Sequence, residues 1–215
     1  MNAALILSGG VGARYGAAVP KQYTRIRRRM VIEYVLDAAK AAKSVDVVMV
    51  AGADCPQLRA LQRKYGFHTA PGGSVRNETL LNGLTALRTL GCERVVILDA
   101  VRPLVTGALI DEYLRLLADG WDAVSTVQAI TDSLGCLDCH EVDRSRYYLM
   151  QSPEGYDLPK LLTHFDPHSP LTEVAHQLPA DSRIHLYRDF PENPKLTYPW
   201  EREAIAAALK MREAD

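Results

Sequence analysis

The sequence lacks the features that would assign it to several specialised classes of protein. Its 215 residues include four cysteines, too few for a disulfide scaffold. The formal net charge is −1, without the basic surplus typical of nucleic-acid-binding domains. No apolar run is long enough to span a membrane, and Ala3–Leu7 lacks the charged flank of a signal peptide. We therefore expect a cytoplasmic protein with no nucleic-acid partner and no membrane partner.

Short motifs that would indicate a haem or metal site are incomplete. The stretch CLDCH from Cys136 to His140 matches a c-type haem attachment motif, but that attachment requires export and no export signal is visible. A single CxxC pair is only half of a zinc site. His164 and His168 are separated by Pro167, which argues against one helix carrying both. We expect reduced thiols in a loop or strand, and no metal site from these residues.

One basic run, Arg25–Arg29, stands out from an otherwise balanced charge distribution. A nucleic-acid site more often comes with a basic surplus over the whole domain. We therefore interpret this run as a solvated hairpin or a local anion-binding patch.

Short apolar runs alternate with amphipathic stretches along the chain. Predicted strands cover residues 3–7, 45–50, 94–98 and 123–127. Predicted helices cover residues 31–42, 56–65, 77–90, 106–118, 157–164 and 200–212. Apolar strands between helices are typical of a parallel sheet covered on both faces, with right-handed crossovers. This pattern predicts an α/β fold.

The domain organisation is simple. The chain is 47% hydrophobic and 24% charged, and no repeat or linker divides it, so we expect one domain over residues 1–215. Residues 131–151 depart from the alternation, since they are rich in polar and β-forming side chains. They are predicted to form a hairpin arm that leaves the sheet.

Three distant segments are predicted to meet at one edge of the sheet. Ser8 and Gly9 follow the first strand, Asp99 follows the strand at 94–98, and Gly72-Gly73 precede a helix. In open α/β sheets, ligands gather beyond the carboxyl ends of the strands. We expect a common crevice there.

The glycine-rich stretch after the first strand reads LSGGVGARYGAAVPKQY from Leu7 to Tyr23. Glycines at a strand end let backbone N–H groups approach a phosphate closely. The spacing from Gly10 to Gly16 is one residue too long for the dinucleotide fingerprint of a dehydrogenase, and no P-loop string occurs. Arg14 and Lys21 add positive charge suited to a polyphosphate. The structural alternative is a tight turn with two exposed cations.

At this point the sequence resembles a family of cytidylyltransferases that join CTP to a polyol phosphate, acting on 2-C-methyl-D-erythritol 4-phosphate or ribitol 5-phosphate. The resemblance runs nearly end to end and rests on five motifs in the family's order. These are Ser8–Arg14 with Pro20–Gln22, Gly72–Asn77 with Asn82–Leu84, Asp99–Pro103, Gln151–Tyr156 and Asn193–Thr197. It implies a Rossmann-like three-layer nucleotidyltransferase fold with a mostly parallel sheet, and a protruding β-arm at 131–151 that makes a homodimer.

The resemblance also implies roles for individual residues, with Mg²⁺ as cofactor. The implied catalytic residues are Arg14, Lys21 and Lys195. The implied CTP-binding residues are Leu7, Ser8, Gly9, Gly10, Gly12, Gly73, Ser74 and Thr79, of which Gly73, Ser74 and Thr79 lie beside cytosine. Asp99, Arg102 and Thr197 are implied to bind the acceptor substrate; Asp99 also holds the metal, and Arg102 fixes its loop or touches the polyol.

Departures from the family pattern concern the acceptor. Leu98 stands where the family often has histidine, and Glu154 stands where it has glutamine. Other stretches, such as Asp122–Val127, look nearer to the ribitol-phosphate branch. We expect an acceptor such as ribitol 5-phosphate or a related capsule or teichoic polyol phosphate, with methylerythritol phosphate of isoprenoid synthesis as the alternative. A non-catalytic nucleotide-binding protein of the same fold is the alternative from another class.

Overall fold

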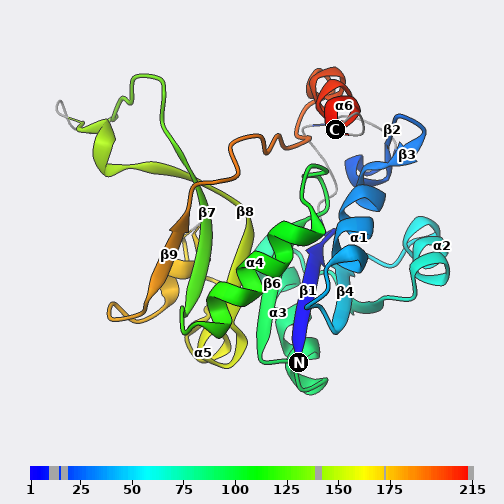
Figure 1. Cartoon of the computed structure of the whole chain (residues 1–215), viewed down its shortest axis with the longest axis horizontal. Helices are drawn as coiled ribbons and strands as arrows, with labels where there is room; N and C mark the ends of the chain where they lie inside the picture. Colours follow the sequence, from blue (N-terminus) through cyan, green and yellow to red (C-terminus); the bar gives the residue numbers. More distant parts are fainter. Residues whose placement is uncertain (10–14, 16–18, 139–141, 172, 213–215) are drawn as a thin grey trace.

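The computed structural model describes residues 1–9, 15, 19–138, 142–171 and 173–212. Seven strands form one sheet in the order β5-β4-β1-β6-β8-β7-β9 (Figure 1). The strands are β1 (Asn2–Leu7), β4 (Val47–Gly52), β5 (His68–Pro71), β6 (Arg94–Asp99), β7 (Ala123–Ala129), β8 (Tyr148–Asp157) and β9 (Ile184–Tyr187). The sheet confirms the α/β fold that the sequence predicts.

Helices cover both faces of this sheet. They are α1 (Val31–Ala41), α2 (Pro56–Tyr65), α3 (Arg76–Thr89), α4 (Gly107–Ala118), α5 (Leu158–His164) and α6 (Glu201–Arg212), with short 3₁₀ turns η1 (Lys21–Tyr23), η2 (Arg144–Arg146) and η3 (Val174–Gln177). Each predicted helix and strand is present, and its bounds differ from the prediction by at most two residues. The strands β5, β8 and β9 were not predicted.

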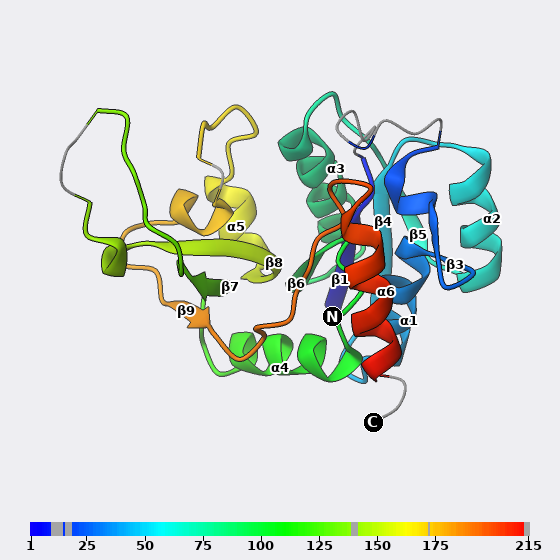
Figure 2. The same ribbon diagram turned by 90° about the horizontal axis from the view of Figure 1, so that it is seen from above.

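The two faces of β1 show why the strands are apolar throughout. Ala4 and Ile6 pack in the cluster that includes α1 and α4, whereas Ala3 and Leu5 pack in the cluster that includes α3 and α5. Successive side chains of a strand point to opposite faces, so a strand covered on both sides alternates between two apolar cores. Figure 2 shows α4 and α1 on one side of the sheet and α3 and α5 on the other.

The sheet is mostly parallel, as the family resemblance implies, with one antiparallel strand. β1, β4, β5 and β6 pair in parallel, but β8 lies antiparallel between β6 and β7. Ile97 of β6 is opposite Glu154 of β8. Because β8 runs the other way, the early part of this strand, around Gln151 and Ser152, reaches the edge where β6 ends.

The helix α2 begins and ends where its sequence directs. Pro56 is the first helical residue, where its missing N–H costs nothing. The Cys55 sulfur accepts the Leu58 N–H at 3.4 Å. Gly66 ends the helix with φ 65°, a left-handed conformation that glycine adopts without strain.

The basic run forms a hairpin, which confirms one of its two interpretations. The strands β2 (Arg25–Ile26) and β3 (Arg29–Met30) pair antiparallel. Arg27 and Arg28 make the turn with φ of 49° and 70°, so both adopt left-handed backbone conformations. Such a turn matches the twist of the flanking strands.

Residues 130–138 and 142–147 project away from the sheet beyond β7 and β8 (Figure 1). Residues 148–151, which the arm was predicted to include, belong to β8. Cys139 and His140 of the CLDCH stretch lie outside the described residues, and Cys136 is exposed. In the described ranges, no helix is long and apolar enough to cross a membrane.

Candidate functional site

The carboxyl ends of the parallel strands bring the predicted segments together. Leu7 of β1 pairs with Asp99 of β6, and Gly52 of β4 pairs with Pro71 of β5. The chain therefore leaves β1, β5 and β6 at the same edge of the sheet. This position follows from the general rule for ligand sites in open α/β sheets.

A cavity of about 520 Å³ lies at this edge. Its lining includes predicted residues from five separate parts of the sequence, which are Leu7, Ser8, Gly9, Lys21, Gly73, Ser74, Thr79, Asp99 and Lys195. Gln22 and Arg76 also line the cavity, although no role was predicted for either residue from the sequence. Gly10, Gly12 and Arg14 lie outside the described residues, so their predicted roles stay predictions.

One wall of the cavity is formed by tight backbone packing between β1 and α3. The Gly73 N–H donates to the Thr79 hydroxyl oxygen at 2.9 Å. A Cβ added to Gly9 would lie 2.7 Å from that same oxygen. Only glycine at position 9 lets the end of β1 approach α3 this closely, because any larger residue would displace Thr79.

Hydrogen bonds at Ser8 and Ser74 fix the loop that follows β1 and the loop that precedes α3. Gln22 donates its side-chain N–H to the Ser8 carbonyl at 2.9 Å, which ties η1 to the end of β1. Ser74 donates both its backbone N–H and its hydroxyl to the Glu78 carboxylate, each at 2.7 Å. These bonds lower the pKa of Glu78, because they favour its charged form. Ser74 therefore offers a ligand its hydroxyl oxygen as an acceptor, while its hydroxyl proton is already used.

Asp99 is the charge centre of the cavity. Its carboxylate accepts from Lys195 Nζ at 2.9 Å and from Arg102 Nε at 3.4 Å. Burial alone would raise the pKa of Asp99, but Lys195, Arg76 and Arg102 outweigh it and lower the pKa from 3.8 to about 2. Asp99 is therefore ionised at neutral pH and holds Lys195 at the cavity.

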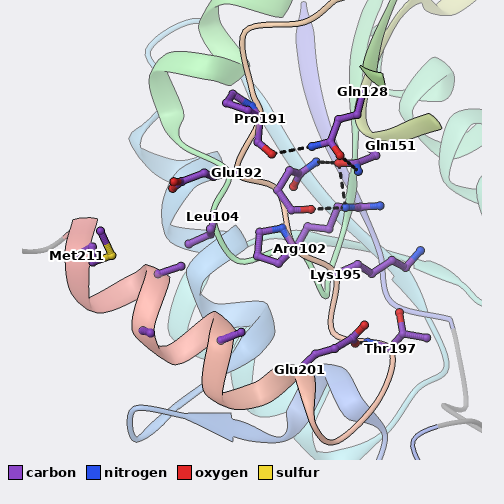
Figure 3. A pocket seen from close by; sticks show the side chains of 15 residues that line it. Arg102, Leu104, Gln128, Gln151, Pro191, Glu192, Lys195, Thr197, Glu201 and Met211 are labelled. Carbon is purple, nitrogen blue, oxygen red and sulfur yellow. Dashed lines mark hydrogen bonds between the residues drawn. The ribbon is translucent and has the colours of Figure 1, made fainter. Parts of the chain in front are cut away.

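Arg102 braces the loops rather than facing the cavity. One terminal nitrogen donates to the Asn193 carbonyl at 2.6 Å and to the Gln151 amide oxygen at 3.3 Å. The Asn193 side chain in turn donates to Gln151 at 2.8 Å. Figure 3 shows this network, which Gln128 extends. These contacts favour the loop-fixing interpretation of Arg102 over contact with the polyol.

A second cavity of about 710 Å³ lies between this network and α6 (Figure 3). Arg102 and Thr197 line this cavity and not the one of 520 Å³, whereas Lys195 lines both. Of the predicted acceptor-binding residues, Arg102 and Thr197 thus line one cavity and Asp99 lines the other, although Arg102 stays in contact with Asp99 at 3.4 Å. The sequence could not predict which cavity each residue lines, because this depends on the path that residues 191–197 take to α6.

The residues that could hold a metal are few. In the ranges that the structure describes, no group of three or more His, Cys, Asp or Glu side chains is placed to bind one. Asp99 presents an ionised carboxylate, the hard oxygen ligand that Mg²⁺ prefers. Mg²⁺ is commonly held by one or two carboxylates together with substrate phosphates and water, so Asp99 fits this role.

The fold and the cavity together define a class. A glycine-lined crevice at the carboxyl edge of an α/β sheet, with two lysines and an acidic residue, is suited to a nucleotide and its phosphates. The chain is a nucleotidyltransferase. Residues 2–182 match the family described as 2-C-methyl-D-erythritol 4-phosphate cytidylyltransferase, and the chain belongs to that family.

Individual relatives agree with this assignment. The chain is 28% identical over 179 residues to the 2-C-methyl-D-erythritol 4-phosphate cytidylyltransferase of Neorickettsia sennetsu, covering 77% of this chain and 76% of the relative. It is 30% identical over 182 residues to the D-ribitol-5-phosphate cytidylyltransferase of Rattus norvegicus, covering 76% of this chain and 39% of the relative. It is 32% identical over 206 residues to the bifunctional IspD/IspF enzyme of Ruegeria, covering 92% of this chain and 53% of the relative. The chain thus spans about half the length of that bifunctional relative.

A solved structure confirms the fold. The 4-diphosphocytidyl-2C-methyl-D-erythritol synthase of Anaerococcus prevotii superposes with a TM-score of 0.82 at 20% identity. The match covers 97% of this chain and 96% of that structure. At this identity the likeness establishes the fold alone.

Proposed function

We propose that this chain transfers CMP from CTP to a polyol phosphate and releases pyrophosphate. The observation that carries the proposal is the cavity of about 520 Å³, where Lys21, Asp99 and Lys195 come together from distant segments. The family membership supports CTP as the nucleotide. It also supports 2-C-methyl-D-erythritol 4-phosphate as the first acceptor to test, and the similarity to the rat enzyme supports ribitol 5-phosphate as the second.

The chemistry is an in-line attack of an acceptor phosphate oxygen on the α-phosphorus of CTP. Both reactants are anions, so neutralising their repulsion and aligning them is most of the catalytic task. Lys195, held by Asp99 at 2.9 Å, supplies a fixed positive charge at the cavity. Lys21 lines the same cavity and supplies another. The attacking phosphate is ionised near neutral pH, so the reaction needs no protein nucleophile.

The base site is assigned to the loop before α3. Gly73 and Thr79, joined by their hydrogen bond, form a rigid wall that lies beside cytosine. A Cβ on Gly73 would lie 2.2 Å from the Glu78 Cβ, so the loop accepts only glycine there without moving. Backbone groups in such a fixed loop can read the edge of a base, which supports selection of cytosine over other bases.

We assign the metal role to Asp99. Bound Mg²⁺ would supply Lewis-acid stabilisation of charge on the reacting phosphates. Asp99 is suited to hold it because neighbouring cations keep its carboxylate ionised.

The arm is proposed to join two copies of the chain. Leu137 is fully exposed on the arm, and Tyr147 and Leu149 are half-exposed near its base. Exposed apolar side chains on a projecting segment are typical of an interface. Sedimentation velocity should give a dimer, and deletion of residues 131–146 should give a monomer.

A pyrophosphate-release assay tests the proposed reaction. CTP, Mg²⁺ and a panel of 2-C-methyl-D-erythritol 4-phosphate, ribitol 5-phosphate and glycerol phosphate should release pyrophosphate with at least one acceptor and only when all components are present. Lys21→Ala should lower the turnover number by two orders of magnitude or more, since it removes a positive charge from the cavity proposed to hold the phosphates, about 3 kcal/mol of transition-state stabilisation. Release by no acceptor with any nucleotide would refute the catalytic assignment.

A further inference from the structure

Arg76 lies where two cavities meet. It lines the CTP cavity of about 520 Å³ and also a neighbouring cavity of about 470 Å³ over residues 167–171. Val75 is the other residue that lines both. A group that passes from the second cavity toward Asp99 and Lys195 therefore comes past Arg76.

A buried acidic side chain anchors Arg76. One terminal nitrogen of Arg76 is 3.2 Å from Glu154 Oε1, and the Glu154 side chain is 1% exposed. The other carboxylate oxygen of Glu154 accepts the Tyr156 hydroxyl at 2.6 Å. Both oxygens of Glu154 are thus occupied, which fixes the anchor.

The guanidinium keeps donors to spare. Within the described part of the chain, Glu154 is its only hydrogen-bonding partner, and the Arg76 side chain is 42% exposed. Although burial acts to lower it, the pKa of Arg76 is raised by the nearby carboxylates of Glu154 and Asp99. Arg76 therefore stays charged, and most of its N–H groups have no acceptor among the described residues.

We propose that Arg76 binds the phosphate of the acceptor and that Glu154 is its positioning residue. This inference rests on the proposed transfer of CMP to a polyol phosphate. A planar guanidinium can bind a phosphate through two parallel hydrogen bonds, which a lysine cannot do. Arg76 is also the first residue of α3, whose amino end favours negative charge.

The position of Arg76 explains why an acceptor subsite belongs here. The acceptor phosphate must reach the α-phosphorus beside Asp99 and Lys195, and both Asp99 and Arg76 line that cavity. The polyol chain then extends into the cavity over residues 167–171. A side chain anchored beforehand loses little conformational freedom when the phosphate arrives.

The test needs a variant that does not leave a buried carboxylate without a positively charged partner. Arg76→Ala alone leaves the Glu154 carboxylate buried without its cation, which can unfold a protein. The double variant Arg76→Ala/Glu154→Gln removes both charges, and Glu154→Gln alone is its reference. Comparing these two isolates the guanidinium in a background with no unpaired carboxylate.

Binding is measured by calorimetry without turnover. The α,β-methylene analogue of CTP is titrated first, and 2-C-methyl-D-erythritol 4-phosphate or ribitol 5-phosphate is then titrated into the loaded protein. We expect the double variant to bind the acceptor about tenfold or more weakly than Glu154→Gln, which corresponds to the loss of charge-assisted hydrogen bonds. The Kd of the CTP analogue should change by less than about twofold.

Glu154→Asp tests the positioning role. It keeps the negative charge but withdraws the anchor from Arg76 by one methylene group. The acceptor KM should rise about fivefold at an unchanged affinity for the CTP analogue, since one poorly placed hydrogen bond costs roughly 1 kcal/mol. Glu33→Gln is the matched control, because Glu33 is also a buried glutamate in an ion pair, with Lys64, and it lines neither cavity.

The outcomes separate this inference from the proposed function. Acceptor binding that is equal in the double variant and in Glu154→Gln would overturn the role of Arg76, as would an equal loss of affinity for the CTP analogue. An acceptor KM unchanged in Glu154→Asp would overturn the role of Glu154. If acceptor binding depends on Arg76 but the wild-type protein releases no pyrophosphate, the subsite stands and the proposed reaction fails.

Discussion

Replacing Asp99 with asparagine should destabilise the protein in a pH-dependent way. The carboxylate is surrounded by Lys195, Arg102 and Arg76, which lower its pKa from 3.8 to about 2 against the effect of burial. Asparagine resembles the protonated form of aspartate, so Asp99→Asn removes this electrostatic contribution at every pH. The Asp99 side chain is 12% exposed, so solvent screens the interaction only weakly.

The magnitude follows from the two pKa values. Lowering the pKa from 3.8 to about 2 corresponds to about 2.4 kcal/mol of unfolding free energy. Because the pKa is lower in the folded state, this stabilisation is present above pH 3.8 and is lost as the pH falls toward 2. By linkage, about 1.1 kcal/mol of it disappears between pH 7 and pH 3.

Urea unfolding of the wild type and the variant at pH 7 and pH 3 measures this difference. We expect the variant to be about 2.4 kcal/mol less stable at pH 7, and the gap to narrow by about 1 kcal/mol at pH 3. Asp119→Asn is the control, since its ion pair with Arg115 is exposed and should contribute little. A variant as stable as the wild type at pH 7, or a gap that does not change with pH, would refute the electrostatic account of Asp99.

Three further substitutions test the cavity. Gly73→Ala should abolish CTP binding in calorimetry, because its Cβ would meet the Glu78 Cβ at 2.2 Å, whereas Gly135→Ala, with nothing within 4 Å, should bind CTP normally. Thr79→Val should weaken CTP binding and lower the unfolding free energy in urea by about 1–3 kcal/mol, because it leaves the Gly73 N–H without its acceptor. If neither quantity changes, the assignment of Gly73 and Thr79 to the cytosine site is contradicted. Lys195→Ala should lower kcat by orders of magnitude with the far-UV circular dichroism unchanged, and wild-type kcat would count against its role.

Much of the fold could be predicted because local signals agree with the tertiary structure. The helix α2 matches its prediction at both ends, since Pro56 and Gly66 act through local backbone geometry alone. The strand β8 was not predicted because Pro153 and Gly155 interrupt the hydrophobic pattern typical of a strand. Its extended conformation is stabilised by pairing with β6 and β7 on either side. Pairing between distant strands leaves no trace in a single short window of sequence.

The candidate site shows the same division. Residues at strand ends, such as Asp99, could be placed because parallel strands share an edge. The ion pair between Arg76 and Glu154 could not, because 78 positions separate them and β8 had to be placed first. The family resemblance grouped Thr197 with Asp99 as an acceptor-binding residue, yet Thr197 lines the neighbouring cavity.

The most direct test of the central claim is a crystal structure with CTP. We predict electron density for the nucleotide in the cavity of about 520 Å³, with cytosine beside Gly73 and Thr79 and the triphosphate contacting Lys21 and Lys195. Density for CTP in the cavity of about 710 Å³ beside α6, with the first cavity empty, would contradict the account.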